Sequence, residues 1–162
     1  MINILVKQID IALKNESFIP ALMASLTLPD ICGKAEYPDS NNKKRYVEWY
    51  DTYIPHGLSP FYDYDKTNKL PVLSGEVVYQ LRCSLLHSGS FQIERNRIIC
   101  SDNKIDSFEI YIEPKNDNDI YIIYLGSSDN SKNIRVGIRG LCKMLTQTAS
   151  AYYVKYREKF EN

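Results

Sequence analysis

Apolar residues follow a helical spacing along most of this chain, and one segment interrupts that spacing. They recur every three or four residues from 2 to 26, from 74 to 89, and again from 133 to 160, as in helices that bury one face. Between residues 108 and 113 the period falls to two, which is typical of a strand with one buried face. The pattern therefore predicts a helical protein with a small β-rich insertion.

The N-terminal part of the chain predicts three helices. The first is amphipathic, and its apolar face consists of Ile2, Leu5, Ile9 and Leu13. Ser17 is a suitable N-cap for the second helix, which is expected to end or kink around Pro29, with Gly33 closing the segment. The third covers residues 43–54 and carries four aromatic residues on one face. We expect these aromatics to be core, and RNA stacking is the alternative.

The stretch from 74 to 89 predicts a helix with well-marked ends. Ser74 has the side chain of an N-cap, and Glu76 in the first turn complements the helix dipole. Gly89 is a suitable C-terminal stop because glycine adopts the left-handed conformation without strain. The sequence Leu-Arg-Cys-Ser-Leu-Leu-His therefore falls in the last two turns of this helix.

A β-rich region is expected between this helix and the last one. Residues 108–113 and 120–125 predict a hairpin with a longish turn, and residues 91–99 suggest a weaker third strand. The final helix is expected from Asn133 onward. The predicted fold is mainly α: a single domain over residues 1–162, built as a helical bundle with a β-hairpin inserted at about 91–126.

Composition excludes several classes of function. The charges balance at 20 basic and 20 acidic residues, and no apolar run approaches the roughly 20 residues that span a bilayer. The N-terminus lacks the features of a signal peptide, so we expect a soluble, cytoplasmic protein that does not contact a membrane. The four cysteines are widely spaced, with no zinc-binding pattern and no phosphate-binding glycine loop. We therefore expect buried, reduced thiols, no metal and no cofactor.

Arg82 and His87 are the residues that most suggest chemistry. An arginine binds phosphate oxygens through paired donors and stays charged, and a histidine transfers protons near neutral pH. Five positions along a helix separate their Cα–Cβ directions by roughly 140°, so the two can serve one phosphate only by side-chain reach. The alternatives are a salt bridge or tyrosine stacking for Arg82 and a helix-capping role for His87.

The segment Leu81–His87 resembles the motif of the HEPN superfamily, the higher eukaryote and prokaryote nucleotide-binding domains. That motif is an arginine, four to six residues, and a histidine near the end of a long bundle helix. Here four residues intervene between Arg82 and His87. The resemblance covers the motif and the helical layout of residues 1–90 and 133–160, and the hairpin lies outside the family's minimal bundle.

The resemblance implies a metal-independent endoribonuclease of the toxin or phage-defence type that acts as a homodimer. In that family the ribose 2′-hydroxyl attacks the phosphorus at a composite site, so His87 would act as base or acid and Arg82 would stabilise charge. Two positions depart from the family pattern. Cys83 replaces a frequent polar residue, and Gly89 replaces a tyrosine found in members silenced by a partner transferase. A neutralising or regulatory protein partner stays open.

Further candidates lie outside the motif. Glu76 shares a helical stripe with Cys83 and His87 and is a weak catalytic candidate, the alternative being an exposed carboxylate at the helix dipole. Four basic residues at helical spacing predict an RNA-binding face on the final helix, with a solvated face as the alternative. They are Lys132, Arg135, Arg139 and Lys143. The competing function is a non-catalytic bundle that binds nucleotide, RNA or a protein partner.

Overall fold

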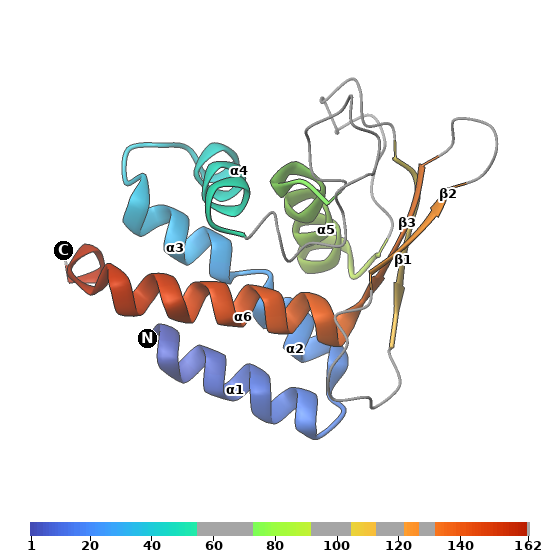
Figure 1. Ribbon diagram of the computed structural model, residues 1–162, viewed down its shortest axis with the longest axis horizontal. Helices are drawn as coiled ribbons and strands as arrows, with labels where there is room; N and C mark the ends of the chain where they lie inside the picture. The colour runs from blue at the N-terminus through green and yellow to red at the C-terminus, as the bar shows by residue number, and fades with distance from the viewer. Residues whose placement is uncertain (55–72, 92–104, 113–121, 127–131, 162) are drawn as a thin grey trace.

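The computed structural model describes residues 1–54, 73–91, 105–112, 122–126 and 132–161. Helices dominate this part of the chain, with a small sheet between the fifth and sixth helices (Figure 1). The elements are α1 (Ile2–Lys14), α2 (Phe18–Ser25), α3 (Leu28–Glu36), α4 (Asn42–Tyr53), α5 (Gly75–Ser88), β1 (Ile105–Tyr111), β2 (Ile122–Gly126), β3 (Lys132–Gly137), α6 (Ile138–Lys155) and the 3₁₀ helix η2 (Arg157–Phe160). The expected mainly α fold with a β-hairpin before the last helix is confirmed.

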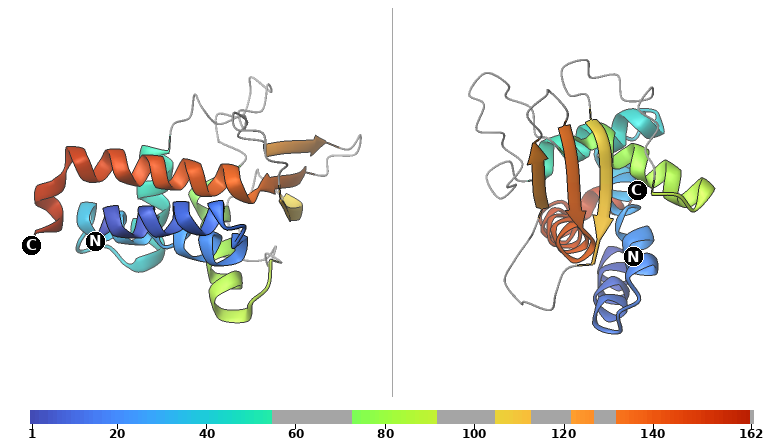
Figure 2. Two further views of the ribbon diagram at one scale, coloured as in Figure 1. Left: turned by 90° about the horizontal axis from the view of Figure 1, so that it is seen from below. Right: turned by 90° about the vertical axis from the view of Figure 1, so that its right-hand side faces the viewer.

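Helix α6 is the centre of the bundle. It packs along α1, α2 and α3, and Figures 1 and 2 show α1 running beside it. Helices α4 and α5 pack against each other and complete the core. The largest side chains that are fully removed from solvent include Trp49, Tyr46, Leu22, Leu81 and Leu145. Three of the four aromatic residues predicted on one face of residues 43–54 (Tyr46, Trp49 and Tyr50) are therefore core, as expected, and Tyr53 is half-buried against it.

Pro29 and Gly33 do not end a helix as the sequence suggested. A new helix, α3, begins at Leu28, and Pro29 lies in its first turn, where its missing N–H leaves no hydrogen bond unmade. Gly33 is buried in the middle of α3. A Cβ atom at Gly33 would lie 2.6 Å from the backbone oxygen of Arg45, so this glycine allows α3 and α4 to approach closely.

The predicted ends of α5 are confirmed. The Ser74 hydroxyl accepts a hydrogen bond from the backbone N–H of Val77 at 3.4 Å. Gly89 adopts φ of 62° and ends the helix. At the start of α2, Ser17 occupies the N-cap position but its side chain makes no capping hydrogen bond.

The sheet differs from the predicted pairing. Its strand order is β1-β3-β2, with β3 parallel to β1 and antiparallel to β2. The hairpin that precedes α6 is therefore formed by β2 and β3. The segments 108–113 and 120–125, which were predicted to pair with each other, contribute to β1 and β2, and these two strands are not neighbours in the sheet. Asn133 lies in β3, so the last helix begins at Ile138 and not at Asn133.

The reason for the error lies in the segment Lys132–Gly137. Its β-branched residues suit a strand, and β3 as the central strand pairs its backbone on both sides. That pairing outweighs the helical spacing that this segment shares with α6. The weaker strand expected at 91–99 lies outside the described residues, apart from Phe91.

Two further sequence expectations concern burial and membranes. Cys32 and Cys142 are buried and Cys83 is half-buried, and burial raises the pKa of Cys32 to about 12. Cys100 lies outside the described residues. Among the helices that the structure describes, none combines the length and the apolar character that a membrane span requires.

Candidate functional site

Arg82 projects from α5 toward α3 and α4. Its Nη2 atom donates to Oδ2 of Asp30, in the first turn of α3, at 3.2 Å. The guanidinium also lies 6.0 Å from the ring centre of Tyr46 and 5.9 Å from that of Tyr79. The side chain is 18% exposed, so Arg82 is largely enclosed but not sealed from solvent.

A second arginine shares the same carboxylate. Arg45, on α4, donates from Nε at 3.1 Å and from Nη2 at 2.9 Å to Oδ1 of Asp30. Asp30, Arg45 and Arg82 thus join three helices, and we call them the Asp30 cluster. One negative charge meets two positive charges in a place where the arginine side chains are only 14% and 18% exposed. The cluster therefore carries a surplus positive charge.

Apart from Asp30 and Arg45, the side chains that surround Arg82 are aromatic or weakly polar. Tyr46 is fully buried, and its hydroxyl donates to the backbone oxygen of Leu26 at 3.1 Å. Desolvation raises the pKa of Tyr46 and of Tyr79, and the thiol of Cys83 raises that of Tyr79 further. Both phenols therefore stay neutral beside the guanidinium at physiological pH. Cys83 interacts with Tyr79, which gives the residue after Arg82 a structural role.

His87 has a different environment from Arg82. It lies in the last turn of α5, and its side chain is exposed. Among the residues that the structure describes, Arg82 is held by α3 and α4, and no contact between Arg82 and His87 is found. The structure therefore does not bring the two motif residues together within one copy of the chain.

Glu76 is neither exposed nor beside His87. Its side chain is 11% exposed, and Oε1 lies 2.6 Å from Nζ of Lys43 on α4. The expected exposure of Glu76 is therefore wrong, although it does lie in the first turn of α5, where the helix dipole favours an acid. The ion pair instead gives Glu76 a role in holding α4 against α5, and its catalytic role stays an untested prediction.

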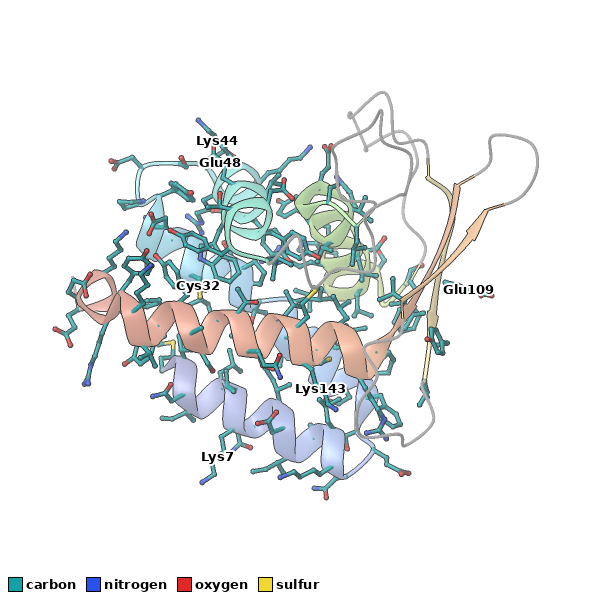
Figure 3. All side chains as sticks on the ribbon, in the orientation of Figure 1. Lys7, Cys32, Lys44, Glu48, Glu109 and Lys143 are labelled. Atoms are coloured by element: carbon teal, nitrogen blue, oxygen red, sulfur yellow. The ribbon has the colours of Figure 1, made fainter. Side chains whose placement is uncertain are left out.

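The four basic residues predicted to form one helical face do not share a helix. Lys132 and Arg135 belong to β3, and Arg139 and Lys143 belong to α6. Arg139 is turned toward α1 and α2: its Nη1 donates to the backbone oxygen of Leu13 at 3.3 Å, and its guanidinium lies 4.6 Å from the ring centre of Phe18. Lys143, labelled in Figure 3, is exposed. The continuous stripe on the last helix is therefore wrong.

A second carboxylate, at the other end of α3, also gathers partners. Glu36 accepts from the Tyr152 hydroxyl at 2.5 Å and from the Lys159 ammonium, and Tyr53 hydrogen-bonds it as well. We call Glu36, Tyr53, Tyr152 and Lys159 the Glu36 cluster. Desolvation raises the pKa of Glu36, but the three hydrogen bonds outweigh it and hold that pKa below its ordinary value.

Asp30 and Arg45 are the site residues that sequence reasoning missed. Asp30 follows Pro29, where a helix was expected to end, so its place in a first helical turn was not anticipated. Arg45 belongs to the basic start of the aromatic helix, for which the sequence predicts a role of the aromatic side chains only. Recognising Pro29 as a residue of the first turn would have revealed Asp30 as a helix-starting acid.

Comparison with protein-family models, with curated proteins and with solved structures finds no match for this chain. Among the described residues, no group of three or more His, Cys, Asp and Glu side chains is placed to hold a metal ion.

Proposed function

We propose that this chain is a metal-independent endoribonuclease of the toxin or phage-defence type, acting as a homodimer on RNA. The observation that carries the proposal is the end of α5. His87 lies there with an exposed imidazole, five residues after Arg82. Asp30 holds the guanidinium of Arg82 in place, within a cluster that has a surplus positive charge. Phosphodiester cleavage needs a proton carrier and a fixed cation, and α5 supplies both.

The chemistry starts from the ribose 2′-hydroxyl. His87 of one copy takes the proton of that hydroxyl as the oxygen attacks the adjacent phosphorus, and His87 of the second copy protonates the departing 5′-oxygen. Arg82 stabilises the charge on the non-bridging oxygens. The products carry a 2′,3′-cyclic phosphate and a 5′-hydroxyl. Because Arg82 and His87 point apart on one helix, a site built from two copies is the arrangement that lets them act together.

The alternative is a non-catalytic bundle that binds nucleotide, RNA or a protein partner. A specific observation favours it: the ion pair with Asp30 and the packing over Tyr46 and Tyr79 give Arg82 a structural role without any catalysis. In that reading the cluster binds an anion, and His87 is an exposed helix-end residue. A neutralising or regulatory partner is compatible with both functions.

The two functions are separated by incubating the purified protein with RNA in the presence of EDTA. We expect cleavage by the wild type and a fall of about 100-fold or more in His87→Ala, with His56→Ala, the other histidine of the chain, as the matched control. Since His87 is exposed, its replacement should leave the thermal midpoint unchanged. Equal cleavage by all three proteins would show contamination and overturn the enzyme proposal.

The composite site has its own test. Light scattering at the assay concentration is expected to show a dimer, and end-group analysis is expected to show 2′,3′-cyclic phosphates. A protein that cleaves RNA as a strict monomer would overturn the two-copy arrangement while leaving the ribonuclease itself supported.

A further inference from the structure

We propose that Arg45 is a second phosphate-binding residue, and that Arg45 and Arg82 together hold a phosphate group of the RNA. This inference rests on the proposed function in naming RNA as the ligand, and it adds a residue from α4 that the motif on α5 does not contain. The argument starts from the way in which the two guanidiniums share Asp30.

The first step is geometric. Arg45 binds Oδ1 of Asp30 and Arg82 binds Oδ2, so the two guanidiniums lie on the two oxygens of one small anion. A phosphate presents oxygens at a spacing similar to that of a carboxylate, and arginine binds both groups through paired N–H donors. Two guanidiniums placed close enough to share Asp30 are therefore close enough to share a phosphate.

The second step concerns unused donors. The contacts to Asp30 occupy Nη2 of Arg82, and Nε and Nη2 of Arg45. Each guanidinium carries further N–H groups. In the described part of the chain, Nε of Arg82 is buried and has no hydrogen-bond partner. A buried donor without an acceptor costs free energy, so an anion that accepts from this pair lowers the energy of the cluster.

The third step is charge. The neighbouring ion pair of Lys43 and Glu76 is neutral by itself, so it does not cancel the surplus of the Asp30 cluster. The partial burial of both arginines reduces screening by water and salt. A phosphodiester, with one negative charge, balances the cluster. Asp30 acts as a positioning residue that keeps both guanidiniums in place in the absence of ligand.

The test measures binding without cleavage. A fluorescent 2′-O-methyl oligoribonucleotide lacks the attacking hydroxyl, so its anisotropy reports affinity alone. We expect Arg45→Gln to weaken binding about tenfold or more and to reduce the slope of log affinity against log salt by about 0.7. The matched control is Arg157→Gln, because Arg157 lies on η2 with a side chain that is 71% exposed.

Circular dichroism monitors the fold of each variant, and Arg45→Lys replaces Arg45→Gln if the latter unfolds. The lysine keeps the charge but loses the paired donors, so it too is expected to bind more weakly. Unchanged affinity in whichever folded variant is measured overturns the inference, as does a wild type that does not bind the oligonucleotide. A loss of equal size in Arg157→Gln overturns it as well.

The inference and the proposed function fail separately. If cleavage depends on His87 but RNA affinity is the same with and without Arg45, the role of Arg45 is overturned and the proposed ribonuclease function is retained. Binding that depends on Arg45, combined with no cleavage by the wild type, retains the phosphate site and overturns the ribonuclease in favour of an RNA-binding bundle.

Discussion

The two ends of α3 each carry a carboxylate with several partners, but the charge balance differs. Asp30, near the N-terminus of α3, is shared by two arginines. Glu36, at its C-terminus, takes one lysine and two neutral tyrosine hydroxyls. The Asp30 cluster therefore has one positive charge too many, whereas the Glu36 cluster is neutral.

The helix dipole sharpens this contrast. An acid in the first turn of a helix is favoured, and an acid in the last turn is disfavoured. Asp30 lies where the helix dipole already favours an acid, yet two guanidiniums bind it. Glu36 lies where the dipole disfavours an acid, and three hydrogen-bond donors bind it. Excess charge in a partly enclosed place marks the Asp30 cluster as the candidate for a ligand, and the Glu36 cluster as a structural link between α3, α6 and η2.

The largest effect is expected from Asp30→Asn, which removes the only negative charge of its cluster. Leaving two largely enclosed guanidiniums without an anion should lower the free energy of unfolding by about 2–3 kcal/mol, below the value for a fully buried pair because Asp30 is 23% exposed. Urea denaturation measures the change. Inorganic phosphate at matched ionic strength should recover part of it, and no recovery would contradict a phosphate site.

Gly33→Ala tests the close approach of α3 to α4, at a position between the two clusters. Alanine is the better helix former, but its Cβ would meet the backbone oxygen of Arg45 at 2.6 Å, so α3 and α4 must separate. We expect a loss of about 1–3 kcal/mol in unfolding free energy and weaker RNA binding through a displaced Arg45. Lys34→Ala, at the exposed neighbouring position, is the control and should be close to neutral.

Glu36→Gln is expected to have a smaller effect, because the amide oxygen still accepts a hydrogen bond and Lys159 can be hydrated. We expect a loss of about 1 kcal/mol in thermal or urea unfolding and no change in RNA binding. Glu158→Gln, at an exposed position of η2, serves as the control. A clear loss of RNA affinity in Glu36→Gln would remove the distinction between the two clusters.

The smallest effect is the pH dependence of the Glu36 cluster. The pKa of Glu36 is lower in the folded protein than its ordinary value of 4.5, so the unfolded chain binds this proton at higher pH than the folded one. The stabilisation is complete above 4.5 and is lost as the pH falls through the folded pKa. The difference in stability between wild type and Glu36→Gln should therefore shrink in acid, and a constant difference would contradict the shift.

The sequence predicted those elements whose local pattern agrees with their packing. Helix α1, the aromatic face of α4 and both ends of α5 follow from periodicity, and Ser74 and Gly89 mark α5 through their own chemistry. Sheet order could not be predicted in this way, because the parallel pairing of β3 with β1 joins backbone partners that are distant in sequence. The start of the last helix was wrongly predicted at Asn133 instead of Ile138 for the same reason, because residues 132–137 pair as a strand.

The residues of the candidate site also differ in whether local sequence or tertiary packing reveals them. Arg82 and His87 stand out because both belong to one helix with a recognisable spacing. Asp30 and Arg45 come from two other helices, and only their packing against α5 brings them to Arg82. Similarly, Arg139 looked like part of a solvated face until tertiary packing placed it over Phe18.

The position of α6 has a consequence for biosynthesis. Helices α1, α2 and α3 are synthesised first, yet α6, which packs along all three, follows α4, α5 and the sheet in the chain. Residues such as Ile9 and Leu22 are fully or almost fully enclosed in the folded protein, and the part of that cover that α6 provides is absent until α6 has been synthesised. We therefore expect the helices that precede α6 to complete their packing only after α6 has been synthesised.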